Sequence, residues 1–92
     1  MKSEIREGQI WTIRGCNKPV IVISKHNICC LVDKDGRKRE KFSETTIHIP
    51  EYGYICCETI MSLDINNLEK CIREVDASLV EEIRDKAINS LK

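Results

Sequence analysis

Short apolar runs rich in β-branched residues, separated by turn signals, fill the first two-thirds of this 92-residue chain. Gln9–Ile13 alternates polar and apolar residues, as a half-buried strand does. Pro19 opens a continuous apolar run to Ile23, and its shortness and its Val and Ile content favour a strand over a buried helix. Further strands are expected at Ile28–Asp33, Thr45–Ile49 and Tyr54–Ile60. Short strands joined by tight turns predict a small, strongly bent sheet or barrel.

The last third of the chain predicts one amphipathic helix. Asp64 can cap a helical turn through Leu68, after which Lys70–Val75 can return to strand. Asp76 is a good N-cap for the final helix. The apolar positions of that helix recur at helical spacing and form one stripe, made of Leu79, Val80, Ile83, Ala87, Ile88 and Leu91. We therefore expect a single domain, residues 1–92, that is mainly β with a C-terminal α-helix.

The composition, with 41% hydrophobic and 33% charged residues, is that of an ordinary globular protein. No apolar run approaches the roughly 20 residues that cross a bilayer. The N-terminal segment Met1–Glu7 is charged and lacks the apolar stretch of a signal peptide. We therefore expect a cytoplasmic protein with no membrane partner.

The formal net charge of zero conceals a division of charge along the chain. Residues 1–42 carry ten Lys or Arg against five Asp or Glu, which gives +5, and residues 43–92 carry five against ten, which gives −5. A basic half beside an acidic half suits a protein that presents one face to a polyanion. Charges placed only on solvated positions would give the same count, so charge alone does not establish a nucleic-acid partner.

Six cysteines are many for a chain of this length. A disulfide framework needs an oxidising compartment, which the missing signal peptide argues against. Four of the cysteines form the adjacent pairs Cys29-Cys30 and Cys56-Cys57. Neighbours on a strand point to opposite faces, so such a pair cannot easily hold one metal ion. We expect no metal and no cofactor, with one cysteine of each pair buried and the other less covered.

Two parts of the chain, taken together, resemble the MazF/PemK family of toxin endoribonucleases. The matching segments are Gly8–Ile13 with its Trp, Lys18–Ser24, Cys57–Asp64 and the Asn67-Leu68 pair before the C-terminal helix. The resemblance implies an SH3-like barrel of the MazF/PemK/CcdB type that forms a homodimer. It also implies a toxin that cleaves single-stranded mRNA without a metal and is held inactive by an antitoxin peptide or protein across its RNA-binding groove.

The resemblance assigns the catalytic positions, and this chain departs from the family at both. The family is described as using an Arg immediately before the Pro-Val of the second strand, and here that position is Lys18. A lysine neutralises phosphate as a point charge but lacks the planar fork of arginine. The glycine-rich loop before it is shortened, and Arg14 is close enough in sequence to supply a guanidinium. The Thr or Ser that ends the third strand corresponds to Asp33, which needs a paired cation or a role as a base beside phosphate.

His26 is a candidate replacement acid or base, because imidazole suits proton transfer near neutral pH. It lies on an expected turn, where a histidine is commonly just exposed to solvent. His48 faces away from Ile47 and Ile49, which favours a structural or surface role.

Residues that could bind RNA without cutting it lie mainly in and around a basic hairpin arm. Expected phosphate contacts come from Lys25, Arg37, Lys38, Arg39 and Lys41. Tyr52 and Tyr54 flank Gly53 and are candidates for base stacking. Trp11 is expected in the core or in a dimer interface.

Two readings therefore compete. The first is a MazF/PemK-like endoribonuclease, and the alternative is a diverged, non-catalytic barrel of the same type that binds nucleic acid or a protein partner. The loss of both the Arg and the Thr supports the alternative. A gyrase-directed toxin of the same superfamily has no sequence feature in its favour.

Overall fold

The computed structural model describes residues 5–24, 26–33, 45–49 and 52–90. Along the chain the elements are β1 (Gln9–Ile13), β2 (Val20–Ser24), β3 (Ile28–Asp33), β4 (Thr46–Ile49), β5 (Gly53–Ser62), a 3₁₀ turn η2 (Ile65–Asn67), β6 (Leu68–Glu74) and α1 (Ala77–Ser90). The predicted fold class, mainly β with a C-terminal helix, is confirmed. The basic positions Lys25, Arg37, Lys38, Arg39 and Lys41 lie outside the described residues.

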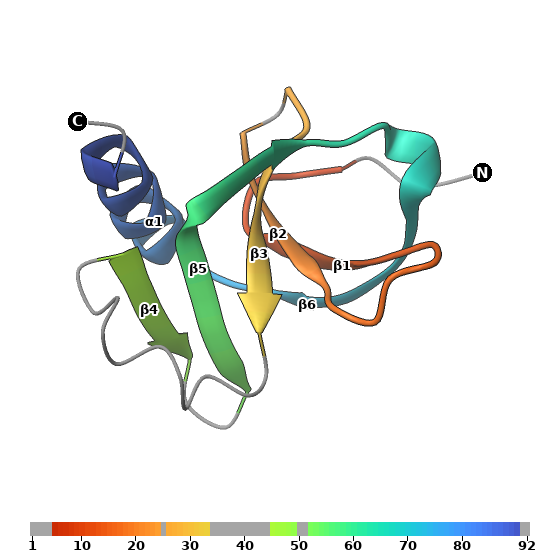
Figure 1. The fold of residues 1–92 in the computed structure, drawn as a ribbon, viewed down its shortest axis with the longest axis horizontal. Helices are drawn as coiled ribbons and strands as arrows, with labels where there is room; N and C mark the ends of the chain where they lie inside the picture. Colours follow the sequence, from red (N-terminus) through yellow and green to blue (C-terminus); the bar gives the residue numbers. More distant parts are fainter. Residues whose placement is uncertain (1–4, 25, 34–44, 50–51, 91–92) are drawn as a thin grey trace.

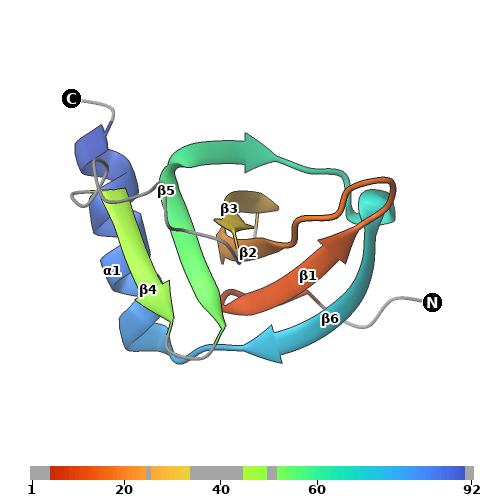
Figure 2. The ribbon, with the colours of Figure 1, turned by 60° about the horizontal axis from the view of Figure 1, so that its bottom comes forward.

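The six strands form one antiparallel sheet in the order β4-β5-β3-β2-β1-β6. In the described part of the chain β4 and β6 are its two edges, so the sheet is open and the expected closed barrel is not confirmed. Figures 1 and 2 show a strongly bent sheet, with α1 beside β5 and β4 and with the β1–β2 connection at the far end of the molecule.

The bend of β5 follows from its pairing with β3. Cys30 pairs with Ile60, whereas the next residue, Leu31, pairs with Cys56, so β5 has extra residues between these two pairs. Such a bulge bends a strand and increases its local twist. The sharp turn of the green ribbon in Figure 1 shows this bend, which directs the two halves of β5 to different parts of the sheet.

Apolar side chains fill both faces of the bent sheet. One cluster packs Ile83 and Ala87 of α1 against strand residues that include Ile10, Ile21, Val32, Ile47 and Ile55. A second cluster on the other face contains Trp11, Val20, Val22, Cys29 and Leu68. Trp11 is 3% exposed and belongs to this second cluster, which confirms the expectation that it lies in the core.

The two cysteine pairs are more deeply covered than the sequence predicts. Cys29, Cys30, Cys56 and Cys57 are all buried, so the expectation that one of each pair is less covered is wrong. Alternation does point adjacent residues to opposite faces, but both faces of this sheet carry a core: Cys30 joins the helix-side cluster and Cys29 the second one. All six cysteines are free thiols.

The helix begins where the sequence predicts. The Asp76 carboxylate accepts the backbone N–H of Leu79 (3.0 Å), so it caps the first turn of α1. Ile83 is fully buried, whereas Ile88 is 55% exposed and does not belong to the buried stripe, contrary to expectation. Leu91 lies outside the described residues. Within those residues, no helix is long and apolar enough to cross a bilayer.

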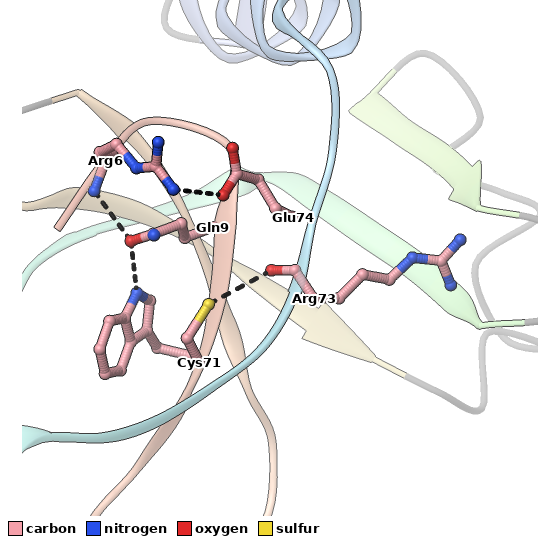
Figure 3. Close-up of polar contacts among 6 residues, drawn as sticks. Arg6, Gln9, Cys71, Arg73 and Glu74 are labelled. Atoms are coloured by element: carbon pink, nitrogen blue, oxygen red, sulfur yellow. Dashed lines mark hydrogen bonds and ion pairs between the residues drawn. The ribbon is translucent and has the colours of Figure 1, made fainter. Parts of the chain in front are cut away.

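The N-terminal segment is fastened to β6 by a small polar cluster (Figure 3). The buried Gln9 side-chain oxygen accepts the Arg6 backbone N–H (2.8 Å) and the Trp11 indole N–H (3.0 Å). The Arg6 guanidinium pairs with the Glu74 carboxylate at 3.1 Å. The cluster holds the edge pair of β1 and β6 and satisfies the indole N–H of the core tryptophan.

Candidate functional site

Lys18 and Asp33, the two positions that the resemblance assigns to catalysis, meet in the structure. The Lys18 ammonium lies 3.3 Å from a carboxylate oxygen of Asp33. Lys18 stands just before β2 and Asp33 ends β3, and the Val32 N–H donates to the Pro19 carbonyl (2.9 Å) to fasten these two strand ends together. The side chains are 47% and 21% exposed, so the pair is open to solvent on one side.

Asp33 belongs to a row of side chains that crosses three strands. It pairs with Tyr54 of β5, and Tyr54 pairs in turn with His48 of β4. Paired residues of an antiparallel sheet project from the same face. Ile47, Ile49 and Ile55, which alternate with these residues, belong to the helix-side cluster. The row Lys18–Asp33–Tyr54–His48 therefore lies on the face of the sheet that α1 does not cover.

At the β4 end of this row two aromatic rings are in contact. The ring centroids of His48 and Tyr54 are 4.6 Å apart, and the rings are tilted by 40°. His48 is exposed and Tyr54 is half-buried. With two strand spacings of about 4.8 Å between them, the backbones of His48 and Asp33 are about 10 Å apart. The row thus joins a cation, a carboxylate and two π faces within a short distance.

Arg14 lies in the same connection between β1 and β2 as Lys18. Its backbone N–H donates to the Asn67 carbonyl (2.9 Å), and Arg14 is exposed to solvent. Arg14 therefore stays a candidate for the second cation, on the grounds of its exposure and of its place in the same connection.

His26 is placed away from the row. It follows β2 in the turn to β3, and its backbone N–H donates to the Ser24 hydroxyl (3.3 Å). Figure 1 shows that the β2–β3 turn lies at one end of the hairpin and the C-terminal end of β3 at the other. Ile28 and Asp33 bound β3, so a rise of about 3.3 Å per residue puts these ends about 16 Å apart. The structure thus does not bring His26 to Lys18 and Asp33.

The two candidate tyrosines do not form one surface. Tyr52 packs against the helix-side cluster, and the Arg73 guanidinium lies 5.3 Å from the centre of its ring. Burial raises the pKa of the Tyr52 hydroxyl, and the nearby Arg73 charge opposes part of that shift. Of the two tyrosines, only Tyr54 lies beside Asp33, on the face of the sheet opposite the helix.

Neither of the two β3 cysteines, Cys29 and Cys30, is an activated nucleophile. Burial raises the pKa of Cys29 to about 11 and, together with neighbouring charges, that of Cys30 to about 12. Both thiols are therefore protonated at neutral pH. The described residues contain no group of three or more His, Cys, Asp or Glu arranged to hold a metal ion.

A hollow of about 530 Å³ lies on the other side of the sheet, where β6 meets the first turn of α1. Two of its carboxylates are engaged, since Glu74 pairs with Arg6 and Asp76 caps the helix. Its lining includes Arg73, whose guanidinium lies over the Tyr52 ring, but none of its described lining residues belongs to the Lys18 row.

His48 is the member of the row to which the sequence assigned only a structural or surface role. The alternation of Ile47, His48 and Ile49 did show that His48 points away from the core. Its position beside Tyr54 depends on the register of β4 with β5, which the sequence does not reveal. The structure thus offers His48, in place of His26, as the histidine nearest to the predicted catalytic pair on the same face.

No protein-family model and no curated protein matches this sequence. Solved structures do match it. An endoribonuclease from a mycobacterial species aligns over 99% of this chain and 94% of its own, with a TM-score of 0.75 and 18% identity. An endoribonuclease in complex with its cognate antitoxin, also mycobacterial, aligns over 95% of this chain and 94% of its own, with a TM-score of 0.72 and 19% identity.

At these identities the likeness concerns the fold. It confirms, at that level, the resemblance to the MazF/PemK toxin endoribonucleases that the sequence indicated.

Proposed function

We propose that this protein is the toxin of a toxin–antitoxin system, an endoribonuclease that cleaves single-stranded mRNA without a metal. The observation that carries the proposal is the Lys18–Asp33 pair at 3.3 Å, which joins the two positions that the resemblance assigns to the family's catalytic Arg and Thr or Ser. The fold shared with mycobacterial endoribonucleases supports it, as does the basic first half of the chain.

Metal-independent cleavage needs a cation at the phosphate and a base at the ribose 2′-hydroxyl. Lys18 would neutralise the charge that develops on the phosphorane, with Arg14 as a second cation. Asp33 would take the proton of the 2′-hydroxyl. The 2′-oxygen then bonds to phosphorus as the bond from phosphorus to the 5′-oxygen breaks, which leaves a cyclic phosphate on one fragment. The row is open to solvent, so water can protonate the departing 5′-oxygen.

The assembly and the partner follow the resemblance. The proposal includes a cytoplasmic homodimer with SH3-like barrels and an antitoxin peptide or protein as inhibitor. One of the mycobacterial endoribonucleases that share the fold is in complex with its cognate antitoxin, which supports the last point. An acidic antitoxin segment would compete with RNA for the basic half of this chain.

The second candidate is a diverged, non-catalytic relative that binds nucleic acid or a protein partner. The same ion pair favours it, because the Lys18 ammonium is already neutralised by Asp33 and lacks the fork of an arginine. In that case RNA would bind and remain intact.

The test is incubation of a long single-stranded RNA with the protein in EDTA, followed by mapping of the fragment ends. Discrete cuts at a short recurring motif would support the endoribonuclease. Intact RNA that nevertheless binds would contradict it and support the non-catalytic relative.

A further inference from the structure

The contact between His48 and Tyr54 has no part in the cleavage chemistry outlined above. The two rings meet at 4.6 Å across the β4–β5 pair, on the face that α1 leaves uncovered. Their counterparts on the opposite face, Ile47, Ile49 and Ile55, account for the packing of these strands against the helix. Packing of β4 and β5 against the helix therefore does not require the aromatic pair. The pair forms a polar, partly exposed surface on the opposite face.

The position of the pair relative to Lys18 indicates what it could bind. Tyr54 is the direct neighbour of Asp33 across the β3–β5 pairing, and Asp33 contacts Lys18. Counted across the sheet, Tyr54 lies two strand spacings from Lys18 (about 10 Å) and His48 lies three (about 14 Å), so a nucleic-acid strand held at Lys18 by one phosphate could place a neighbouring base over these rings. Each nucleotide of such a strand joins a phosphate to a flat base. Bases in single strands stack on exposed aromatic and imidazole rings.

We propose that His48 and Tyr54 form a stacking subsite for a nucleobase of single-stranded RNA, next to the nucleotide whose phosphate Lys18 holds. The inference rests on the proposed function and extends it, because it assigns base contact to His48 and to β4. Stacking on these rings does not depend on which base is present. The subsite would therefore add affinity and hold the RNA strand in position relative to Lys18, without selecting a base.

The experiment measures binding separately from cleavage. The probe is a short, mixed-sequence single-stranded oligonucleotide with 2′-fluoro sugars, which lacks the 2′-hydroxyl and cannot be cut. Fluorescence anisotropy gives its Kd for the wild-type protein, His48→Ala, His48→Phe and His26→Ala. His26→Ala is the matched control, since it removes an exposed histidine from the far end of the hairpin. Thermal unfolding checks that each variant is folded.

We expect His48→Ala to weaken binding about tenfold, within the range found when a stacking ring is removed. His48→Phe should restore most of the affinity, because phenylalanine keeps a ring beside Tyr54. His26→Ala should bind as the wild type does. An abasic oligonucleotide of the same length should bind wild type and His48→Ala equally.

Equal affinity of His48→Ala and wild type for the base-bearing probe would overturn the subsite, as would failure of His48→Phe to restore binding. An equal loss with the abasic probe would overturn it too, since the effect would not involve bases. Cleavage in EDTA separates the two proposals. Wild-type protein that cuts RNA while His48→Ala binds normally refutes only the subsite, and protein that binds through His48 without cutting refutes only the endoribonuclease.

Discussion

The Lys18 ammonium and the Asp33 carboxylate form an ion pair at 3.3 Å, although 15 residues separate them in sequence. At the two positions that the resemblance assigns to an Arg and to a Thr or Ser, this chain carries two groups of opposite charge. A carboxylate would repel an RNA phosphate if it stood alone, but here it faces a cation. Because Lys18 is paired with it, Asp33 is compatible with a phosphate at this position. The same placement allows Asp33 to act as a base.

Asp33→Asn separates the role of base from that of a simple surface charge. Removal of the negative charge should strengthen RNA binding, because Lys18 is no longer neutralised and repulsion of phosphate is relieved. Loss of the proton acceptor should abolish cleavage at the same time. Gel-shift and cleavage assays on the same RNA test both effects. Cleavage at the wild-type rate would remove Asp33 from the mechanism.

Ile83→Ala tests the packing of the helix on the sheet. Ile83 is fully buried between α1 and the strands, so its truncation should lower the free energy of unfolding by about 2–4 kcal/mol. Ile88→Ala is the matched control, since Ile88 is 55% exposed and should change stability by less than about 0.5 kcal/mol. Urea denaturation of both variants gives the comparison. Similar values for the two would mean that α1 is not packed as described.

Gly8→Ala should destabilise the protein more than Gly15→Ala does. Gly8 has a φ of +93°, and an added Cβ would lie 2.7 Å from the Val75 backbone oxygen. Gly15 has a φ of +78° with no atom within 4 Å of such a Cβ, so Gly15→Ala should cost only the left-handed conformation, roughly 1–2 kcal/mol. Thermal melts should rank Gly8→Ala clearly below Gly15→Ala. The reverse order would contradict the close approach of the Gly8 and Val75 backbones.

The Asp76 cap should make the stability of α1 depend on pH. The Leu79 N–H and the Ser78 hydroxyl donate to this carboxylate and lower its pKa below the usual 3.8. A pKa that is lower in the folded state stabilises the protein fully above about pH 4, and the contribution is lost as pH falls through the folded value. Asp76→Asn keeps a capping side chain but removes the charge. Its urea midpoint should lie below that of wild type at neutral pH, and the two should converge as the pH falls through the folded pKa of Asp76. A constant difference at both pH values would argue against the charged cap.

The sequence predicted the elements of the fold well because their signals are local. The β-branched run of β2 and the Asp76 cap each act within a few residues, and both appear where expected. Ile88 was assigned to the buried stripe on helical spacing alone, but it is 55% exposed, because spacing does not show how far the sheet extends beneath each helical turn. The buried state of both cysteines in each pair likewise depends on a second core, which is a property of the whole sheet.

The candidate site was predictable only in part for the same reason. Lys18 and Asp33 were found through the resemblance, while their contact depends on how β2 pairs with β3. The register that joins Asp33, Tyr54 and His48 depends on pairings between distant segments and on the bulge in β5. A one-residue shift of β4 would turn His48 to the opposite face. Arg14 and Lys18 lie in one short connection between β1 and β2, whereas His26 lies at the opposite end of the β2–β3 hairpin.

The most direct test of the central claim is the rate of RNA cleavage in EDTA by wild type, Lys18→Ala and the control Lys70→Ala, which removes an exposed lysine from β6. An exposed ion pair contributes about 0–1 kcal/mol, so Lys18→Ala should unfold at nearly the wild-type urea concentration. We predict discrete cuts by wild type and Lys70→Ala and none by Lys18→Ala. Equal cleavage by all three proteins would contradict the assignment of the Lys18–Asp33 pair as the site of the reaction.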